Sequence, residues 1–152
     1  MSESEKILDQ FKKMYYGGAW FGSGLKEILD GVDSETAVKR PIETAHNILE
    51  IANHISIWIK AVNHQLIGTP LQVSDDENWL PKNSYNGKMW ANTLNKLDER
   101  ISELLNQLSR TSDEKLSETV NGEEYTFYFL IYGLLQHCVY HAGQIALLKK
   151  TM

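Results

Sequence analysis

The sequence lacks the features that mark secreted and membrane proteins. It contains one cysteine, Cys138, so no internal disulfide can form and we expect a reducing compartment. No uninterrupted apolar run approaches the ~20 residues that a membrane-spanning helix needs. The N-terminal segment MSESEKILDQFKK is too charged for a secretory signal. We therefore predict a soluble, cytoplasmic protein with no membrane partner.

Basic clusters and the common catalytic motifs are missing as well. The chain has 15 Lys and Arg against 20 Asp and Glu, its formal net charge is −5, and no Lys/Arg cluster offers a stripe for phosphates. We therefore expect no nucleic-acid partner. The sequence also contains no Ser/His/Asp order, no Gly-rich phosphate loop and no zinc ribbon.

What is present is the composition of an ordinary globular domain. Hydrophobic residues make up 42% of the chain and charged residues 23%, as in typical soluble domains. A chain of 152 residues is long enough to bury a core without disulfide or metal staples. We therefore predict a single domain over residues 1–152.

Apolar residues recur at helical spacing in four long segments, and no series of strands is indicated. The segments are Ser4–Tyr16 with its continuation Trp20–Leu29, Ile48–Leu66, Gly87–Leu108, and the stretch from Thr126 to about Lys149. Gly17 and Gly18 interrupt the first segment, which predicts either one kinked helix or two stacked pieces. The pattern predicts an all-α fold, a four-helix bundle.

Local signals place the starts of two helices and the nature of two connections. Asn47, followed by Glu50, fits a capping box, and Thr126 is a suitable N-cap. The segment Thr69–Tyr85 is long for a compact domain, and a crossover that lets the flanking helices run parallel explains it. Val120 and Tyr125 flank an Asn-Gly pair and are expected to form a minimal hairpin. The charged residues between Lys96 and Glu103 are expected to face solvent.

The last segment carries two histidines on the stripe that is expected to be buried. The stripe consists of Leu130, Leu134, His137, His141, Gln144 and Leu148. Residues four apart on a helix lie one above the other, so both imidazoles can reach one point in space. Each buried neutral imidazole leaves a polar atom unpaired unless both nitrogens find partners, and a shared cation satisfies one nitrogen of each ring. The alternative, two core histidines with separate hydrogen-bond partners, stays open.

A third histidine, His54, lies on the buried face of the second helix, whereas His46 precedes that helix and His64 lies on its solvated side. Three histidines fill three positions around a divalent cation and leave room for water or substrate. We therefore predict a metal site formed by His54, His137 and His141. Imidazole suits zinc, nickel, copper and iron, so these ligands do not identify the metal.

Four neighbouring residues receive weaker interpretations. Gln144 either holds a ligand ring or caps the polar end of the pocket. Trp58 is expected to fill the core or to wall the site, and Trp79 to cover one end of the bundle. Cys138 points roughly 100° away from the histidine stripe and is expected to be a buried, inert thiol.

The segments GGAWFGSGLKEIL, ANHISIW and QHCVYHAGQIALLKK resemble the DinB-like (DinB/YfiT-like) superfamily of metalloenzymes. The resemblance implies an up-down-down-up bundle in which His54, His137 and His141 bind a divalent metal, usually zinc or nickel, and a homodimer. Characterised relatives include S-transferases that use bacillithiol, mycothiol or glutathione, and maleylpyruvate isomerases. Two departures bear on function: Cys138 stands where similar sequences often have an acid, and Phe21 where they often have a histidine.

Three hypotheses follow, and no catalytic residue is assigned in any of them. The first is a metal-dependent S-transferase that joins a low-molecular-weight thiol to a small electrophilic substrate. The second is a metal-dependent hydrolase, which the lack of an Asp or Glu beside the histidines disfavours. The third is a non-enzymatic, stress-related metal-binding or dimer-forming protein.

Overall fold

Helices make up the regular secondary structure of the computed structural model, which describes residues 1–82 and 84–152. They are α1 (Glu3–Tyr16), α2 (Leu25–Leu29), α3 (Ser34–Val38), α4 (Ile48–Leu66), α5 (Asp75–Asn78), α6 (Met89–Leu108), α7 (Asp113–Ser117) and α8 (Phe127–Lys149). The described residues form no strand beyond two isolated bridges, so the all-α prediction is confirmed. None of these helices has the length and apolar character that crossing a bilayer requires.

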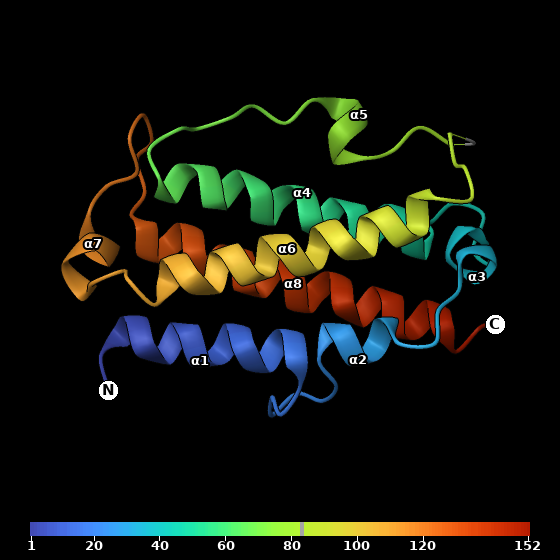
Figure 1. Cartoon of the computed structure of the whole chain (residues 1–152), viewed down its shortest axis with the longest axis horizontal. Coiled ribbons are helices and arrows are strands. Elements are labelled where there is room, and N and C mark those ends of the chain that lie inside the picture. Colours follow the sequence, from blue (N-terminus) through green and yellow to red (C-terminus); the bar gives the residue numbers. More distant parts are fainter. Residues whose placement is uncertain (83) are drawn as a thin grey trace.

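The four long helices lie lengthwise beside one another. Figure 1 shows α1 and α8 running from left to right and α4 and α6 from right to left. Helices α1 and α4 each pack against both α6 and α8. The connector between α4 and α6 returns along the outside of α4 (Figure 1), as expected of a crossover.

Side-chain caps fix where the two helices of the site begin. The Asn47 side chain accepts the backbone N–H of Glu50 at 2.8 Å, and the Glu50 carboxylate accepts the backbone N–H of Asn47 at 2.8 Å. Thr126 accepts the backbone N–H of Phe129 at 3.3 Å. The predicted capping box and N-cap are thus confirmed. They set the position of every later side chain on α4 and α8.

The core lies between the inner faces of the long helices. Its fully buried side chains include Phe11, Leu49, Ile55, Ile101 and Ile131. Replacing such a residue by alanine typically costs about 2–5 kcal/mol. Because every long helix contributes to this cluster, the relative positions of α4 and α8 are held by packing along their whole length.

Of the two arrangements predicted for the first segment, the structure shows two helical pieces, and the second begins at Leu25 rather than at Trp20. Residues 17–24 are non-helical, Trp20 is fully exposed, and the outcome is two separate helices. The backbone turns sharply here because Gly17 and Gly18 adopt φ values of 118° and 91°, which favour glycine. A Cβ on Gly24 would lie 2.5 Å from the Gly17 nitrogen. The close approach of the two ends of this loop therefore also requires glycine.

Three charged side chains of α6 that were expected to face solvent contact neighbouring helices. Glu103 accepts a hydrogen bond from the Asn63 side chain of α4 at 3.3 Å. Asp98 accepts hydrogen bonds from the Tyr15 hydroxyl of α1 and from Lys26 Nζ at 3.0 Å. Arg100 donates to the buried Ser56 hydroxyl of α4 at 2.8 Å. Apolar periodicity cannot locate such contacts, because these long side chains reach across the edge of the packed face.

The connections between the long helices contain one hairpin that was predicted and helical turns that were not. The Val120 N–H donates to the Tyr125 carbonyl at 2.9 Å, and Gly122 takes the turn with φ 83°, as the Asn-Gly pair predicted. Helix α5 lies within the crossover between α4 and α6, and α7 precedes the hairpin between α6 and α8. At four and five residues they are too short to show an apolar period.

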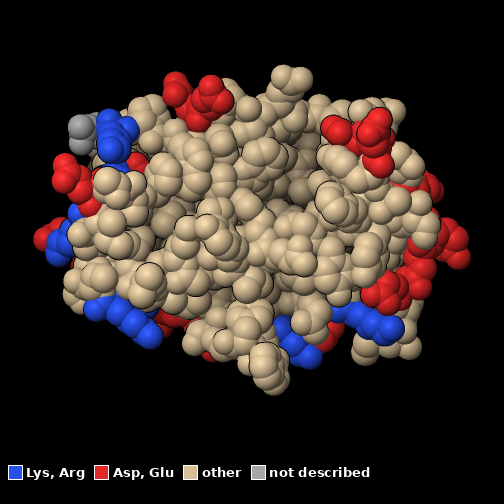
Figure 2. All heavy atoms as spheres, turned by 180° about the vertical axis from the view of Figure 1, so that it is seen from behind, with Lys and Arg blue, Asp and Glu red and all other residues tan. Residues whose placement is uncertain are grey.

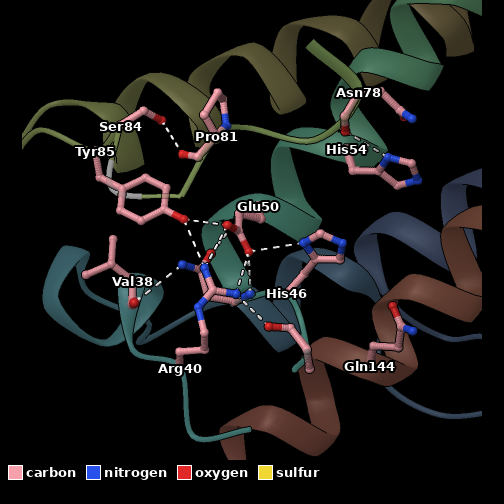
Figure 3. Close-up of polar contacts among 12 residues, drawn as sticks. Val38, Arg40, His46, Glu50, His54, Asn78, Pro81, Ser84, Tyr85 and Gln144 are labelled. Atoms are coloured by element: carbon pink, nitrogen blue, oxygen red, sulfur yellow. Dashed lines mark hydrogen bonds and ion pairs between the residues drawn. The ribbon is translucent and has the colours of Figure 1, made fainter. Parts of the chain in front are cut away.

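A buried carboxylate ties the start of α4 to the preceding loop and to the crossover. Glu50 is 1% exposed and accepts two hydrogen bonds from Arg40, at 2.8 and 3.1 Å, and one from the Tyr85 hydroxyl. It also contacts His46 Nδ1 at 3.2 Å (Figure 3). Burial alone raises the pKa of a carboxyl group, but the hydrogen bonds from Arg40, Tyr85 and Asn47 outweigh it and lower the pKa of Glu50 to about 2.

This carboxylate should make the stability of the fold sensitive to acid. A folded-state pKa of about 2 against an ordinary value of 4.5 corresponds to at most about 3 kcal/mol. Because the folded-state pKa is the lower one, this stabilisation is present above pH 4.5 and is lost as the pH falls toward 2. Glu50→Gln should lower the free energy of unfolding at pH 7 and flatten its decline between pH 5 and pH 3, measured by urea unfolding.

Glu35→Gln is the control, because the Glu35 side chain is 84% exposed and should leave the wild-type pH profile unchanged. A Glu50→Gln variant with the same decline as wild type would contradict this prediction.

Candidate metal centre

His54, His137 and His141 converge in space. One ring nitrogen from each lies within 4.8 Å of the others, and Nε2 of His54 is 2.9 Å from Nε2 of His137. The ring centroids are 4.5–4.9 Å apart. The structure therefore brings together the three residues that the sequence singled out, one from α4 and two from α8. That they hold a metal stays a prediction.

The donor set fits a divalent cation. A tetrahedral zinc with bonds of 2.0–2.1 Å separates two ligand nitrogens by about 3.3 Å. To bind zinc, the 2.9 Å separation of the His54 and His137 nitrogens would therefore have to increase by only a few tenths of an ångström. Without a cation, these two nitrogens can face each other only if one of them carries a proton. Three neutral imidazoles are a set that binds zinc or nickel well.

Hydrogen bonds at Nδ1 orient the rings of His54 and His141 and leave Nε2 without a proton. His54 Nδ1 donates to the backbone carbonyl of Asn78 at 3.0 Å, and since a carbonyl only accepts, the proton is on Nδ1. His141 Nδ1 lies 2.6 Å from Gln144 Oε1, and the same reasoning leaves its Nε2 unprotonated. Both rings thus direct an Nε2 lone pair at a possible cation, as metal-binding histidines do. Of the two roles considered for Gln144, the contact supports the holding of a ligand ring.

The histidines are kept neutral by their surroundings. Burial lowers the pKa of all three imidazoles, and for His137 the proximity of His141 and His54 adds to the effect, so its pKa falls to about 4. At neutral pH they are therefore in the form that binds metals. Cys138 is different: burial raises the pKa of its thiol to about 12, so it is a protonated core residue, in line with the sequence interpretation.

Trp79 covers the cluster from the crossover. Its ring is stacked on His54, with centroids 3.9 Å apart and planes 6° apart, and its other face is stacked on His46 at 3.6 Å and 2°. The Trp58 Nε1 donates to Asn78 Oδ1 at 2.9 Å, which holds the crossover against α4. The sequence predicted that Trp79 covers one end of the bundle. The structure instead places its ring on the histidine cluster, in the crossover that runs along the outside of α4 (Figure 1).

Sequence reasoning missed the part played by His46. His46 lies outside the cluster of three histidines, yet it completes the stack on Trp79, and Figure 3 shows it beside Glu50. Its only sequence signal is the four-residue spacing to Glu50. The predicted burial of the clustered histidines is confirmed for His54 and His141, which are buried, whereas His137 is half-buried.

Two cavities meet the cluster from different sides. One, of about 510 Å³, is lined by His54, His137, Trp58 and further apolar residues. The other, of about 420 Å³, is lined by His141, Gln144, Trp79 and their neighbours. Both volumes are typical of small-molecule sites. Trp58 therefore forms a cavity wall, the second of the two roles considered for it.

Comparison with known proteins identifies the family. The family model described as the DinB superfamily matches residues 22–145, a stretch that contains all three clustered histidines. No curated protein and no solved structure shows a match to the chain.

Metal binding should depend on the clustered histidines and not on His64. His64 Nδ1 contacts the Thr69 carbonyl at 3.2 Å, outside the cluster. We expect His137→Ala to weaken zinc or nickel binding by at least ~100-fold, since two imidazoles remain, and His64→Ala to leave it within about twofold of wild type. Isothermal titration and plasma mass spectrometry measure both. Equal loss in the two variants would show that the ligand assignment is wrong.

Proposed function

The chain belongs to the DinB superfamily, and we propose that it binds zinc or nickel through His54, His137 and His141 and joins a low-molecular-weight thiol to a small electrophile. The observation that carries this proposal is the convergence of three neutral imidazoles at a point that two cavities reach. We further propose that the long helices form the family's up-down-down-up bundle, which the helix directions in Figure 1 support, and that the protein is cytoplasmic.

The cation, when bound, supplies a Lewis acid that lowers the pKa of a thiol and keeps it nucleophilic at neutral pH. His54, His137 and His141 would hold that cation and would leave coordination positions for exogenous molecules. The Asn78 carbonyl and Gln144 keep the proton of His54 and His141 on Nδ1. Trp79 covers one side of the cluster and excludes water there, while the cavities admit ligands from the remaining sides.

The alternatives find less support in the residues around the cluster. A hydrolase needs a base beside the metal-bound water, and among the described residues no Asp or Glu joins the histidines in the cluster. The nearby Glu50 is engaged by Arg40 and Tyr85. A non-enzymatic, stress-related metal protein would be served by a closed site, whereas these histidines border two cavities.

Thiol conjugation by the metal-loaded protein tests this proposal. Zinc- or nickel-loaded wild type, given bacillithiol, mycothiol or glutathione with monochlorobimane as the electrophile, should exceed the uncatalysed rate by roughly 100-fold, a modest value for Lewis-acid activation of a bound nucleophile. His141→Ala should fall to the uncatalysed rate and His64→Ala should match wild type. Equal rates for wild type and His141→Ala would count against the proposal, and thiol-independent ester hydrolysis lost in His141→Ala would favour the hydrolase.

We also propose that the protein is a homodimer that pairs through the outer face of the C-terminal half of α8. From Tyr140 to Leu148 this helix carries no Lys, Arg, Asp or Glu, and Tyr140 and Leu147 are 66% and 60% exposed. Helix α8 lies behind α6 in Figure 1, and Figure 2 shows that side of the molecule with its charged residues at the periphery and an uncharged centre. An exposed apolar area of this kind typically marks an interaction site.

A charge on this face should weaken self-association. We expect sedimentation equilibrium to show a dimer for wild type and a dissociation constant at least ~10-fold higher for Tyr140→Lys, because a lysine in an apolar interface loses its hydration. Asn92→Lys, on the exposed side of α6, is the matched control and should dimerise like wild type. Tyr140→Lys that associates as tightly as wild type would contradict the proposed interface.

A further inference from the structure

We propose that the cavity beside His54 and His137, here called the apolar cavity, binds an uncharged, flat, largely apolar molecule and rejects ions of similar shape. Its lining residues are His54, Trp58, Val62, Asn78, Tyr125, Phe129, Leu130, Gly133, Leu134 and His137. The assignment of this molecule as the electrophile rests on the proposed function. The inference that the molecule is uncharged, flat and largely apolar rests only on the residues that line the cavity.

The lining contains no Lys, Arg, Asp or Glu. In the metal-free protein, a carboxylate or ammonium that enters such a cavity loses its hydration and finds no oppositely charged side chain in the lining, which costs several kcal/mol. The cavity beside His141 and Gln144 likewise has no Lys, Arg, Asp or Glu in its lining. A cavity away from the cluster, of about 580 Å³ between α1, α2 and α6, differs, because its lining includes Lys26, Glu27, Asp30 and Asp98.

Aromatic rings form the walls of the apolar cavity. The Tyr125 and Phe129 rings lie 5.4 Å apart, and the Trp58 ring is held by its hydrogen bond to Asn78 Oδ1. Aromatic walls held in this way favour flat ligands that stack or meet them edge-on. Because Trp58 occupies the Asn78 oxygen, the amide NH₂ of Asn78 is the group left to donate to a ligand. One weakly polar atom, such as a carbonyl or hydroxyl oxygen, therefore fits an otherwise apolar ligand.

Entry to the cavity lies on the uncharged side of the molecule. Phe129 and Trp58 are both exposed at the surface, and Figure 2 shows a hollow among uncharged atoms on that side. A neutral ligand thus meets no charged side chain of the lining between solvent and the histidine cluster.

Substitution of Gly133 by a larger residue can fill the cavity without altering the histidines. It lies on α8 in the lining, and a Cβ built on it meets no atom within 4 Å. A leucine there should therefore occupy cavity space and also raise helix propensity by up to ~1 kcal/mol. Gly143 is the matched control, because it is on the same helix, has the same open surroundings, and lines neither cavity beside the cluster.

Three ligands that share one ring system test the proposal: 2-naphthylmethanol, 2-naphthoate and protonated 2-naphthylmethylamine. Isothermal titration into the full chain in the presence of a chelator prevents direct ligation of a metal by the carboxylate or amine. We expect the alcohol to bind wild type and Gly143→Leu equally, within about twofold, and each ion to bind at least ~10-fold more weakly. The alcohol should bind Gly133→Leu at least ~10-fold more weakly than wild type, with circular dichroism showing that the variant is folded.

Failure of the alcohol to bind, equal affinity for alcohol and carboxylate, or unchanged binding by Gly133→Leu would each overturn the proposal. The readout is independent of catalysis. Loss of thiol conjugation with intact binding of the alcohol would therefore refute the proposed function alone, whereas turnover by wild type and Gly133→Leu at equal rates would refute the cavity assignment alone.

Discussion

The approach of His54 on α4 to His137 on α8 is the contact on which the site depends. Their Nε2 atoms are 2.9 Å apart, although the residues are separated by 83 positions in the chain. Neither ring can move far, because α4 and α8 are locked by the same core and His54 is also bonded to the Asn78 carbonyl. A metal site assembled from two helices needs this rigidity, since ligand nitrogens must meet at a separation set within a few tenths of an ångström.

The sequence predicted those parts of the structure that repeat or that have a fixed local chemistry. The long helices follow from apolar spacing, and the start of α4 from the Asn47 and Glu50 pair. The three histidines could be selected because helical spacing places each of them on the buried face of its helix. What it could not predict are contacts between segments far apart in the chain: the stacking of His46 on Trp79 and the bonds of Asp98 to α1 and α2. Such contacts depend on packing geometry that no local period encodes.

The surroundings of the histidines combine low hydration with access for solutes, two properties that conflict in many buried sites. Low hydration keeps the imidazoles neutral, and two cavities nevertheless bring the same rings within reach of solutes. The conflict is resolved by apolar walls, since a cavity without charged groups holds few strongly bound waters. The chain thus combines a dry environment for the nitrogen donors with open access.

The crossover between α4 and α6 contributes Asn78 and Trp79, which orient and cover His54, whereas the three clustered histidines all come from the long helices. The support of His54 and the histidines themselves are therefore encoded in separate stretches of the chain, while Gln144 supports His141 from within α8. Substitutions or changes of length within the crossover can reshape one wall of the centre and its reactivity while the helical framework persists. A family built on this plan can diversify its chemistry by exchanging a single loop.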